Sequence, residues 1–196
     1  MLLLFRNIRR NDEVCKDDCI KFGIRRIYGF DDFKINFTYP KKVVNSIIDD
    51  EYLDGRERFR YKKAVILMGA NATGKTSIGK ALLKIITYIN TGNIAVLYDM
   101  IMGKTGSFLI DFVNDGFCLH RLIGNIDVVT SSIDIKYQSA KIDKMDSYEK
   151  CITKLEDHTN EAMKNINSLK KIIGPISYRF AYPEIESSIL LNDIDR

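Results

Sequence analysis

The sequence predicts an α/β fold, because an apolar strand, a glycine-rich loop and an amphipathic helix follow one another in its first half. Ala64-Val65-Ile66-Leu67-Met68 is a continuous apolar run, which is typical of a strand covered on both faces in a parallel or mixed sheet. The loop occupies residues 69–74, and helical spacing begins at Lys75. Thr91-Gly92 ends the helix, and its predicted apolar face comprises Ile78, Leu82, Ile85, Ile86 and Ile89.

Two strands are predicted ahead of the loop. Residues 1–10 form the first. In residues 33–39, apolar and polar side chains alternate with the period of two that marks a half-buried strand, and Pro40 ends it. Residues 41–60 are polar and charged, and we expect a surface loop there.

An antiparallel β-subdomain is predicted after the helix. Residues 107–112 and 116–123 have strand character and flank Asn114-Asp115-Gly116, in which the Asp-Gly pair is a strong hairpin signal. Residues 126–137 predict one or two further strands.

A long helix is predicted over residues 147–173, where apolar residues recur every three or four positions. Asp146 and Glu149 are spaced as in a capping box, and Gly174-Pro175 ends the segment. Such a helix would be roughly 40 Å long at 1.5 Å per residue. Either it packs on its own domain, or it is one arm of a coiled coil or helical hairpin.

Composition bounds the class of protein. A chain of 196 residues is long enough for one domain, or for a domain with an appendage. Its formal net charge of +4 permits a nucleic-acid partner without arguing strongly for one. The four cysteines lack the second pair that a zinc site needs, so we expect free thiols in the cytoplasm. The opening MLLLF is too short for a signal peptide or a membrane span.

Residues 69–76 fit the pattern G-x-x-x-x-G-K-[ST] at every fixed position. Glycines permit close approach of a phosphate, and the loop's N–H groups together with the helix N-terminus attract an anion. Lys75 can reach the β- and γ-phosphates, and Thr76 can offer its hydroxyl to Mg²⁺. The predicted nucleotide-binding residues are Gly69, Ala70, Asn71, Ala72, Thr73, Gly74, Lys75, Thr76 and Ser77.

With its flanks, LMGANATGKTSIGKALL resembles the phosphate-binding loop (P-loop) of ABC-type ATPases, with Asn71 and Lys75-Thr76-Ser77 carrying the likeness. This group includes transporter ATPases, structural-maintenance-of-chromosomes proteins, recombination-repair ATPases and overcoming-lysogenization-defect nucleases. The chain is most similar to stand-alone bacterial AAA family ATPases, often of phage-defence systems. The resemblance implies the N-terminal half of a P-loop NTPase with an antiparallel β-subdomain and a helical insertion.

The resemblance also implies roles for residues outside the loop. An early aromatic or basic residue would stack on adenine, and Phe30, Phe33 and Arg26 are the candidates beside ordinary packing. Gln138 occupies the place of a glutamine that contacts Mg²⁺ and the attacking water.

The chain departs from the family in its later motifs. It lacks an L-S-G-G-Q-like signature, a convincing Walker B motif (an apolar run ending in Asp-Glu) and the histidine beyond it. Residues 95–99 and 189–193 match the Asp-Glu motif only in part. We interpret His120 and His158 as structural or solvent-exposed residues. We therefore expect the N-terminal part of a longer ATPase. The predicted units are 1–142, a nucleotide-binding lobe; 143–174, the long helix; and 175–196, a return segment.

Three functions follow from these expectations. The first is an ABC-type ATPase that binds ATP with Mg²⁺ and closes as a homodimer or with an effector protein. The second is a P-loop kinase, for which residues 56–63 supply arginines but lie on the wrong side of the loop for a lid. The third is a truncated, non-catalytic module that binds a partner protein through residues 147–173. Residues 56–63 either bind nucleic acid or form a solvated, charged surface.

Overall fold

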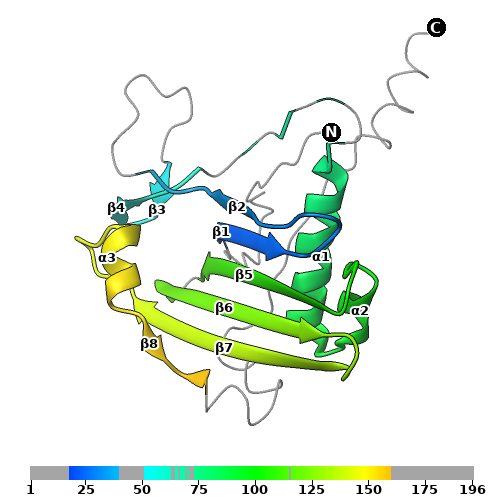
Figure 1. The fold of residues 1–196 in the computed structure, drawn as a ribbon. Helices are drawn as coiled ribbons and strands as arrows, with labels where there is room; N and C mark the ends of the chain where they lie inside the picture. The colour runs from blue at the N-terminus through cyan, green and yellow to red at the C-terminus, as the bar shows by residue number, and fades with distance from the viewer. Residues whose placement is uncertain are drawn as a thin grey trace, which may run out of the picture.

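The structure is a computed structural model, and it describes residues 18–39, 51–62, 65, 67–68, 70, 73–114 and 116–159. The fold is α/β, with few helices and an antiparallel sheet in the order β2-β1-β5-β6-β7-β8 (Figure 1). The strands are β1 (Asp18–Arg25), β2 (Phe33–Asn36), β5 (Thr105–Val113), β6 (Cys118–Asp127), β7 (Ser132–Lys141) and β8 (Glu156–Asp157).

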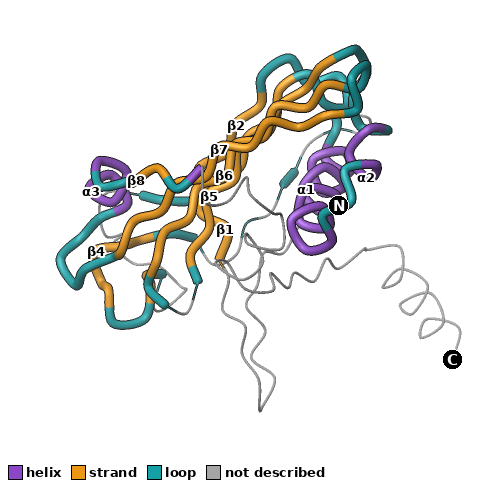
Figure 2. The backbone as a smooth tube through the Cα atoms, turned by 90° about the horizontal axis from the view of Figure 1, so that it is seen from below, coloured by secondary structure: helices purple, strands orange, loops and turns teal. Residues whose placement is uncertain are grey.

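One face of the sheet is covered by α1 (Lys75–Thr91) and α2 (Ala95–Tyr98), which lie on the same side of the strands in Figure 2. The helix predicted after the loop is confirmed. It ends at Gly92, whose φ of 72° is left-handed and whose N–H donates to the Tyr88 carbonyl at 2.7 Å. The predicted apolar face is buried against alternate residues of the strands, among them Phe22, Ile24, Phe108, Ile110, Phe112, Leu122, Ile126, Ile135 and Tyr137.

A second apolar cluster lies at the other end of the sheet, where α3 (Tyr148–Thr153) and the hairpin of β3 (Tyr52–Leu53) and β4 (Arg56–Arg60) gather (Figure 1). Its buried members are Ile20, Leu53, Phe59, Tyr61, Val113, Leu119, Ile142, Tyr148 and Cys151. Val113 and Leu119 alternate with residues that face α1, so this cluster extends onto the opposite face of the sheet.

A buried ion pair attaches α3 to the sheet. Asp111 is fully buried, and both of its carboxylate oxygens accept from the Arg121 guanidinium at 2.8 Å. The Tyr148 hydroxyl donates to the same carboxylate at 2.6 Å. Because Tyr148 is the first residue of α3, this contact fixes where the helix begins on the sheet.

The antiparallel strands predicted after the helix are confirmed, and they share one sheet with β1 and β2. β5 and β6 pair antiparallel about the Asn114 turn, and β6 pairs in turn with β7 over ten positions. β2 begins at Phe33 as predicted but ends at Asn36. After it, the Phe37 N–H donates to the Ile20 carbonyl, and Thr38 forms an isolated β-bridge with Tyr61. The strand predicted at 1–10 lies outside the described residues.

Two expectations about the segments before α1 are wrong in the described residues. Residues 51–60 form the β3–β4 hairpin about Asp54-Gly55, where a loop was expected. Val65, Leu67 and Met68 are not in a strand, and Val65 and Leu67 instead pack on the α1 core. The six described strands of the main sheet pair only with one another. Val65, Leu67 and Met68 therefore do not pair with any of them as a parallel strand.

The helix predicted over 147–173 is confirmed over Tyr148–Thr153, but it does not continue unbroken through the described residues that follow. α3 ends at Thr153, and Glu156–Asp157 pair with Gln138 and Ser139 as β8. Ser147 is the N-cap, where the Asp146–Glu149 pair was expected, and its hydroxyl accepts from Lys150 N at 3.4 Å. α3 therefore contacts the second cluster, β8 pairs with β7, and residues 160–196 lie outside the described part.

None of the described helices has the length and apolar character that crossing a lipid bilayer would require.

Candidate functional site

The candidate site lies where the glycine-rich segment enters α1. Of the predicted loop, Ala70, Thr73 and Gly74 are described, whereas Gly69, Asn71 and Ala72 lie outside the described residues. Gly74 has a φ of 83°, a left-handed conformation that favours glycine. A methyl group on Gly74 would lie 2.5 Å from Cζ of Phe30, so any side chain at this position would require the Phe30 ring to move.

Lys75 folds back over the loop that precedes it. Its ammonium group donates to the Ala70 carbonyl and, at 3.0 Å, to the Thr73 hydroxyl oxygen. The Thr73 hydroxyl donates to the same Ala70 carbonyl at 2.9 Å. Thr73 and Ala70 are exposed, so these two contacts of the ammonium group lie beside solvent. An anion would offer Lys75 a stronger, charge-assisted partner.

The first turn of α1 adds positive potential to this corner. The helix has 17 residues, its N-cap is Gly74, and its first turn contains no acidic residue. Aligned peptide dipoles place a partial positive charge at a helix N-terminus, and no carboxylate of the first turn offsets it here. Thr76 is exposed within this turn, and Ser77 is half-buried.

The structure brings two of the three aromatic and basic candidates to the loop. Phe30 contacts Gly74, and the ring of Phe33 lies 5.4 Å from that of Phe30. Both rings are half-buried and pack at the edge of the α1 core. Arg26 is directed toward β5 instead. Its guanidinium donates to Oγ1 of Thr105, the first residue of that strand, at 3.2 Å.

Gln138 is not brought to the loop. It lies in β7 opposite Arg121 and next to β8. Its neighbour Tyr137 faces the α1 core, and side chains alternate along a strand, so Gln138 lies on the other face of the sheet. The sheet therefore separates Gln138 from Lys75.

The acidic segment at 95–99 and His120 both have structural settings. Residues 95–98 form α2, and Asp99 after it is ion-paired with Lys84 of α1. His120 is buried in β6, where its Nδ1 lies 2.8 Å from the Tyr137 hydroxyl and its ring stacks on Phe112. Burial lowers the pKa of His120 to about 4, so the ring is neutral at pH 7. The described part of the chain holds no cluster of three His, Cys, Asp or Glu side chains with metal-site geometry.

Sequence reasoning missed a polar groove on the face of the sheet that α1 does not cover. The groove contains side chains from four neighbouring strands and from the β1–β2 connection. Its signal is present in the sequence as alternation in β5, β6 and β7, where Ser107, Asn125 and Asp134 each lie between apolar neighbours. Only strand register reveals that these three residues are adjacent.

Taken together, the geometry at the start of α1 suits an anion rather than a cation or an apolar ligand. A glycine corner, a helix N-terminus without an acidic residue in its first turn and a lysine that donates to Ala70 and Thr73 meet within residues 70–77. The chain has no detectable match among protein families, curated proteins or solved structures.

Proposed function

We propose that the chain binds ATP with Mg²⁺ through residues 69–77, and that it hydrolyses ATP as part of a complete ABC-type ATPase. The observation that carries this proposal is the position of Lys75, which bends back over the glycine-rich segment at the positive end of α1. A phosphate chain lying along that segment would replace Ala70 O and Thr73 Oγ1 as the partner of the ammonium group.

Each residue has a defined task in this proposal. The main-chain N–H groups of the loop and of the first turn of α1 hold the β- and γ-phosphate oxygens. Thr76 is exposed in that turn and offers its hydroxyl to Mg²⁺, which neutralises charge on the phosphates when it is bound. The half-buried pair Phe30 and Phe33 provides an apolar surface beside Gly74 for the base.

Binding without rapid turnover is the outcome that we expect for this chain alone. Phosphoryl transfer depends on a positioned metal and water, and the sequence lacks the acidic, signature and histidine motifs that would complete them. The alternative of a module that binds a partner through one long helix at 147–173 loses support, because α3 ends at Thr153 and Glu156–Asp157 form β8.

A titration of ATP with Mg²⁺ into the full chain tests the proposal. Lys75→Ala should weaken binding at least tenfold, because the charge-assisted contacts to the phosphates are lost. Lys80→Ala is the matched control, since Lys80 is an exposed lysine further along α1, and it should bind like the wild type. Thr76→Ala should reduce the gain in affinity that Mg²⁺ provides.

The same samples assayed for phosphate release separate binding from hydrolysis. Equal affinity in the wild type and Lys75→Ala would contradict the proposal. Rapid turnover by the wild type would support ATP binding but would show that the chain contains an acid that its sequence motifs do not reveal.

A further inference from the structure

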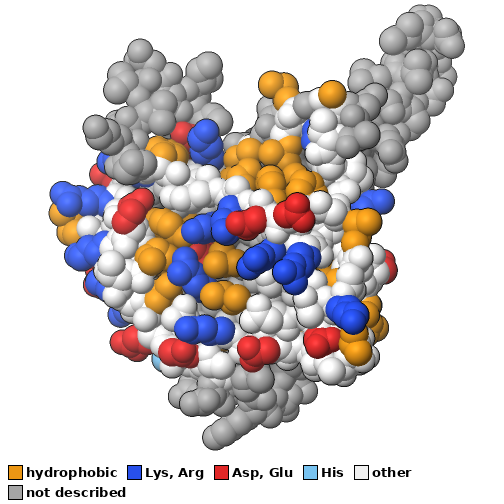
Figure 3. All heavy atoms as spheres, viewed as in Figure 1, with side chains coloured by type: hydrophobic (Ala, Val, Ile, Leu, Met, Phe, Trp, Pro, Cys, Tyr) orange, Lys and Arg blue, Asp and Glu red, His pale blue; other side chains and the backbone are white. Residues whose placement is uncertain are grey.

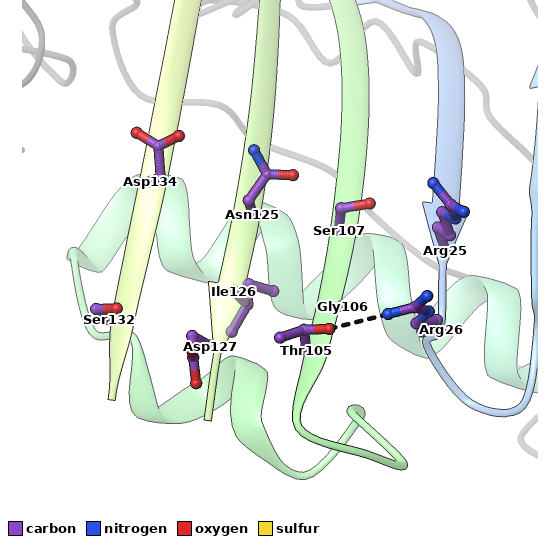
Figure 4. Close-up of a pocket in the computed structure, with 10 residues that line it drawn as sticks. All are labelled: Arg25, Arg26, Thr105, Gly106, Ser107, Asn125, Ile126, Asp127, Ser132 and Asp134. Atoms are coloured by element: carbon purple, nitrogen blue, oxygen red, sulfur yellow. Dashed lines mark hydrogen bonds between the residues drawn. The ribbon is translucent and has the colours of Figure 1, made fainter. Parts of the chain in front are cut away.

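The groove on the uncovered face of the sheet is built from two rows of paired residues. Strand register places Arg25 opposite Ser107, Ser107 opposite Asn125, and Asn125 opposite Asp134. In the adjacent row, Thr105 lies opposite Asp127 and Asp127 opposite Ser132, and Arg26 closes this row at the β1 side. Figure 4 shows the first row crossing β1, β5, β6 and β7. The groove has a volume of about 370 Å³.

The charges in this groove are separated by sign. Arg25 and Arg26 lie at the β1 side, Asp127 and Asp134 at the side of β6 and β7, and neutral hydroxyl and amide groups lie between them. Neither Arg25 nor Asp134 forms an ion pair or hydrogen bond with another side chain in the described part of the chain, whereas Lys136 on the same face is paired with Asp157. The wider face mixes both signs of charge (Figure 3).

Arg26 has a strained backbone conformation. Its φ is 56°, in the left-handed region where a residue with a Cβ is strained by roughly 1–2 kcal/mol. Neighbouring contacts maintain this conformation, since Ile27 bridges to Ile101 and Tyr28 N donates to the Met100 carbonyl at 2.8 Å. Strain of this kind gathers where a side chain must be presented in a fixed direction.

The spacing of the charges selects the ligand. Arg25 and Asp134 are separated by three strand spacings of roughly 4.8 Å, which is about 14 Å. An extended polypeptide advances roughly 3.3 Å per residue, so residues i and i+4 are about 13 Å apart and point to the same side. Nucleic acid fits poorly, because Asp127 and Asp134 would repel its phosphates.

We propose that this groove binds an extended segment of a partner polypeptide that carries an acidic residue and, four residues away, a basic one. The acidic side chain pairs with Arg25 and Arg26, and the basic one with Asp134 and Asp127. Ser107 and Asn125 hydrogen-bond the segment between these two positions. This site lies on the opposite face of the sheet from α1, and it does not depend on nucleotide binding.

The test is a titration of the full chain with the acetylated and amidated peptide Glu-Ser-Thr-Ser-Lys, followed by amide chemical shifts. We expect shifts confined to the groove, at Ser107 and Asn125 above all. The peptide Glu-Ser-Thr-Lys should bind at least tenfold more weakly, because residues three apart in an extended chain point to opposite sides. Peptides with two glutamates or two lysines should be weakened similarly.

Variants of the chain identify the site. Arg25→Gln and Asp134→Asn should each weaken binding of Glu-Ser-Thr-Ser-Lys at least tenfold, and both residues are exposed, so folding should persist. Lys141→Gln, an exposed charge of β7 outside the groove, is the matched control and should leave affinity unchanged. Absence of binding at millimolar peptide, equal binding of all four peptides, or binding of a uridine oligonucleotide at the groove instead would overturn the proposal.

Discussion

Gly74 shows how one backbone position can join the candidate phosphate-binding loop to the core. Its left-handed φ of 83° turns the chain into α1, and its missing side chain leaves room for the Phe30 ring. The sequence motif predicted a glycine here for phosphate approach. The contact with Phe30 adds a reason that the motif does not contain, because Phe30 lies 44 positions earlier in the chain.

Gly74→Ala should therefore lower the free energy of unfolding by about 2 kcal/mol, through the positive φ and the clash with Phe30. In a double-mutant cycle with Phe30→Ala, the clash disappears while the backbone cost remains, so the two changes should couple by about 1 kcal/mol. Urea unfolding of the four proteins measures this coupling. Additivity within about 0.3 kcal/mol would show that the two residues are not in contact.

His120 predicts a dependence of stability on pH. Burial lowers the pKa of the folded ring to about 4, whereas an unfolded histidine titrates near 6.5. Between these values the unfolded chain binds more protons, so the free energy of unfolding falls as pH falls, by up to about 3 kcal/mol. The double variant His120→Phe, Tyr137→Phe removes both partners of the 2.8 Å contact and should lose most of this slope between pH 7 and 5. If the free energy of unfolding depended on pH as steeply in the double variant, groups other than His120 would be responsible for that dependence.

At the scale of elements, α3 depends on a side-chain anchor more than on its own length. A helix of six residues is too short to be stable alone, and the Tyr148–Asp111–Arg121 contacts hold it on the sheet. These contacts join residues from β5, β6 and α3 that are far apart in sequence.

Arg121→Met should lower the free energy of unfolding by roughly 3–5 kcal/mol, because it leaves the buried Asp111 carboxylate without its cation. Lys136→Met breaks the exposed Lys136–Asp157 pair and should change the same quantity by less than about 0.5 kcal/mol. Chemical denaturation of both variants compares a buried with an exposed pair. Equal effects would mean that Asp111 is not charged and buried as described.

Elements with strong local signals were predictable, and those that depend on distant partners were not. The spacing of Ile78 to Ile89 and the turn at Asn114 predicted α1 and the β5–β6 hairpin. The β3–β4 hairpin has the same Asp-Gly signal, at Asp54-Gly55, which the surrounding charged residues obscured. The pattern at 147–173 predicted one helix, but β7 offers residues 156–157 a strand edge, and pairing interrupts it.

Over the whole molecule, the sheet separates two sites. The nucleotide candidate lies at the start of α1 on one face, and the charged groove lies on the other. The residues of the first candidate could be proposed from the sequence because they are consecutive in it. The groove was not, since its residues come from four strands and only their register makes them neighbours. The position of Gln138 relative to Lys75 was not predictable for the same reason, because it depends on the sheet.

Amide hydrogen exchange with and without ATP and Mg²⁺ tests the central claim most directly, because it locates the ligand on the chain. The account predicts slower exchange over residues 69–78 in the wild type, none of this protection in Lys75→Ala, and no change at Ser107 or Asn125. Protection by ATP at the groove, or anywhere else with residues 69–78 unaffected, would contradict it.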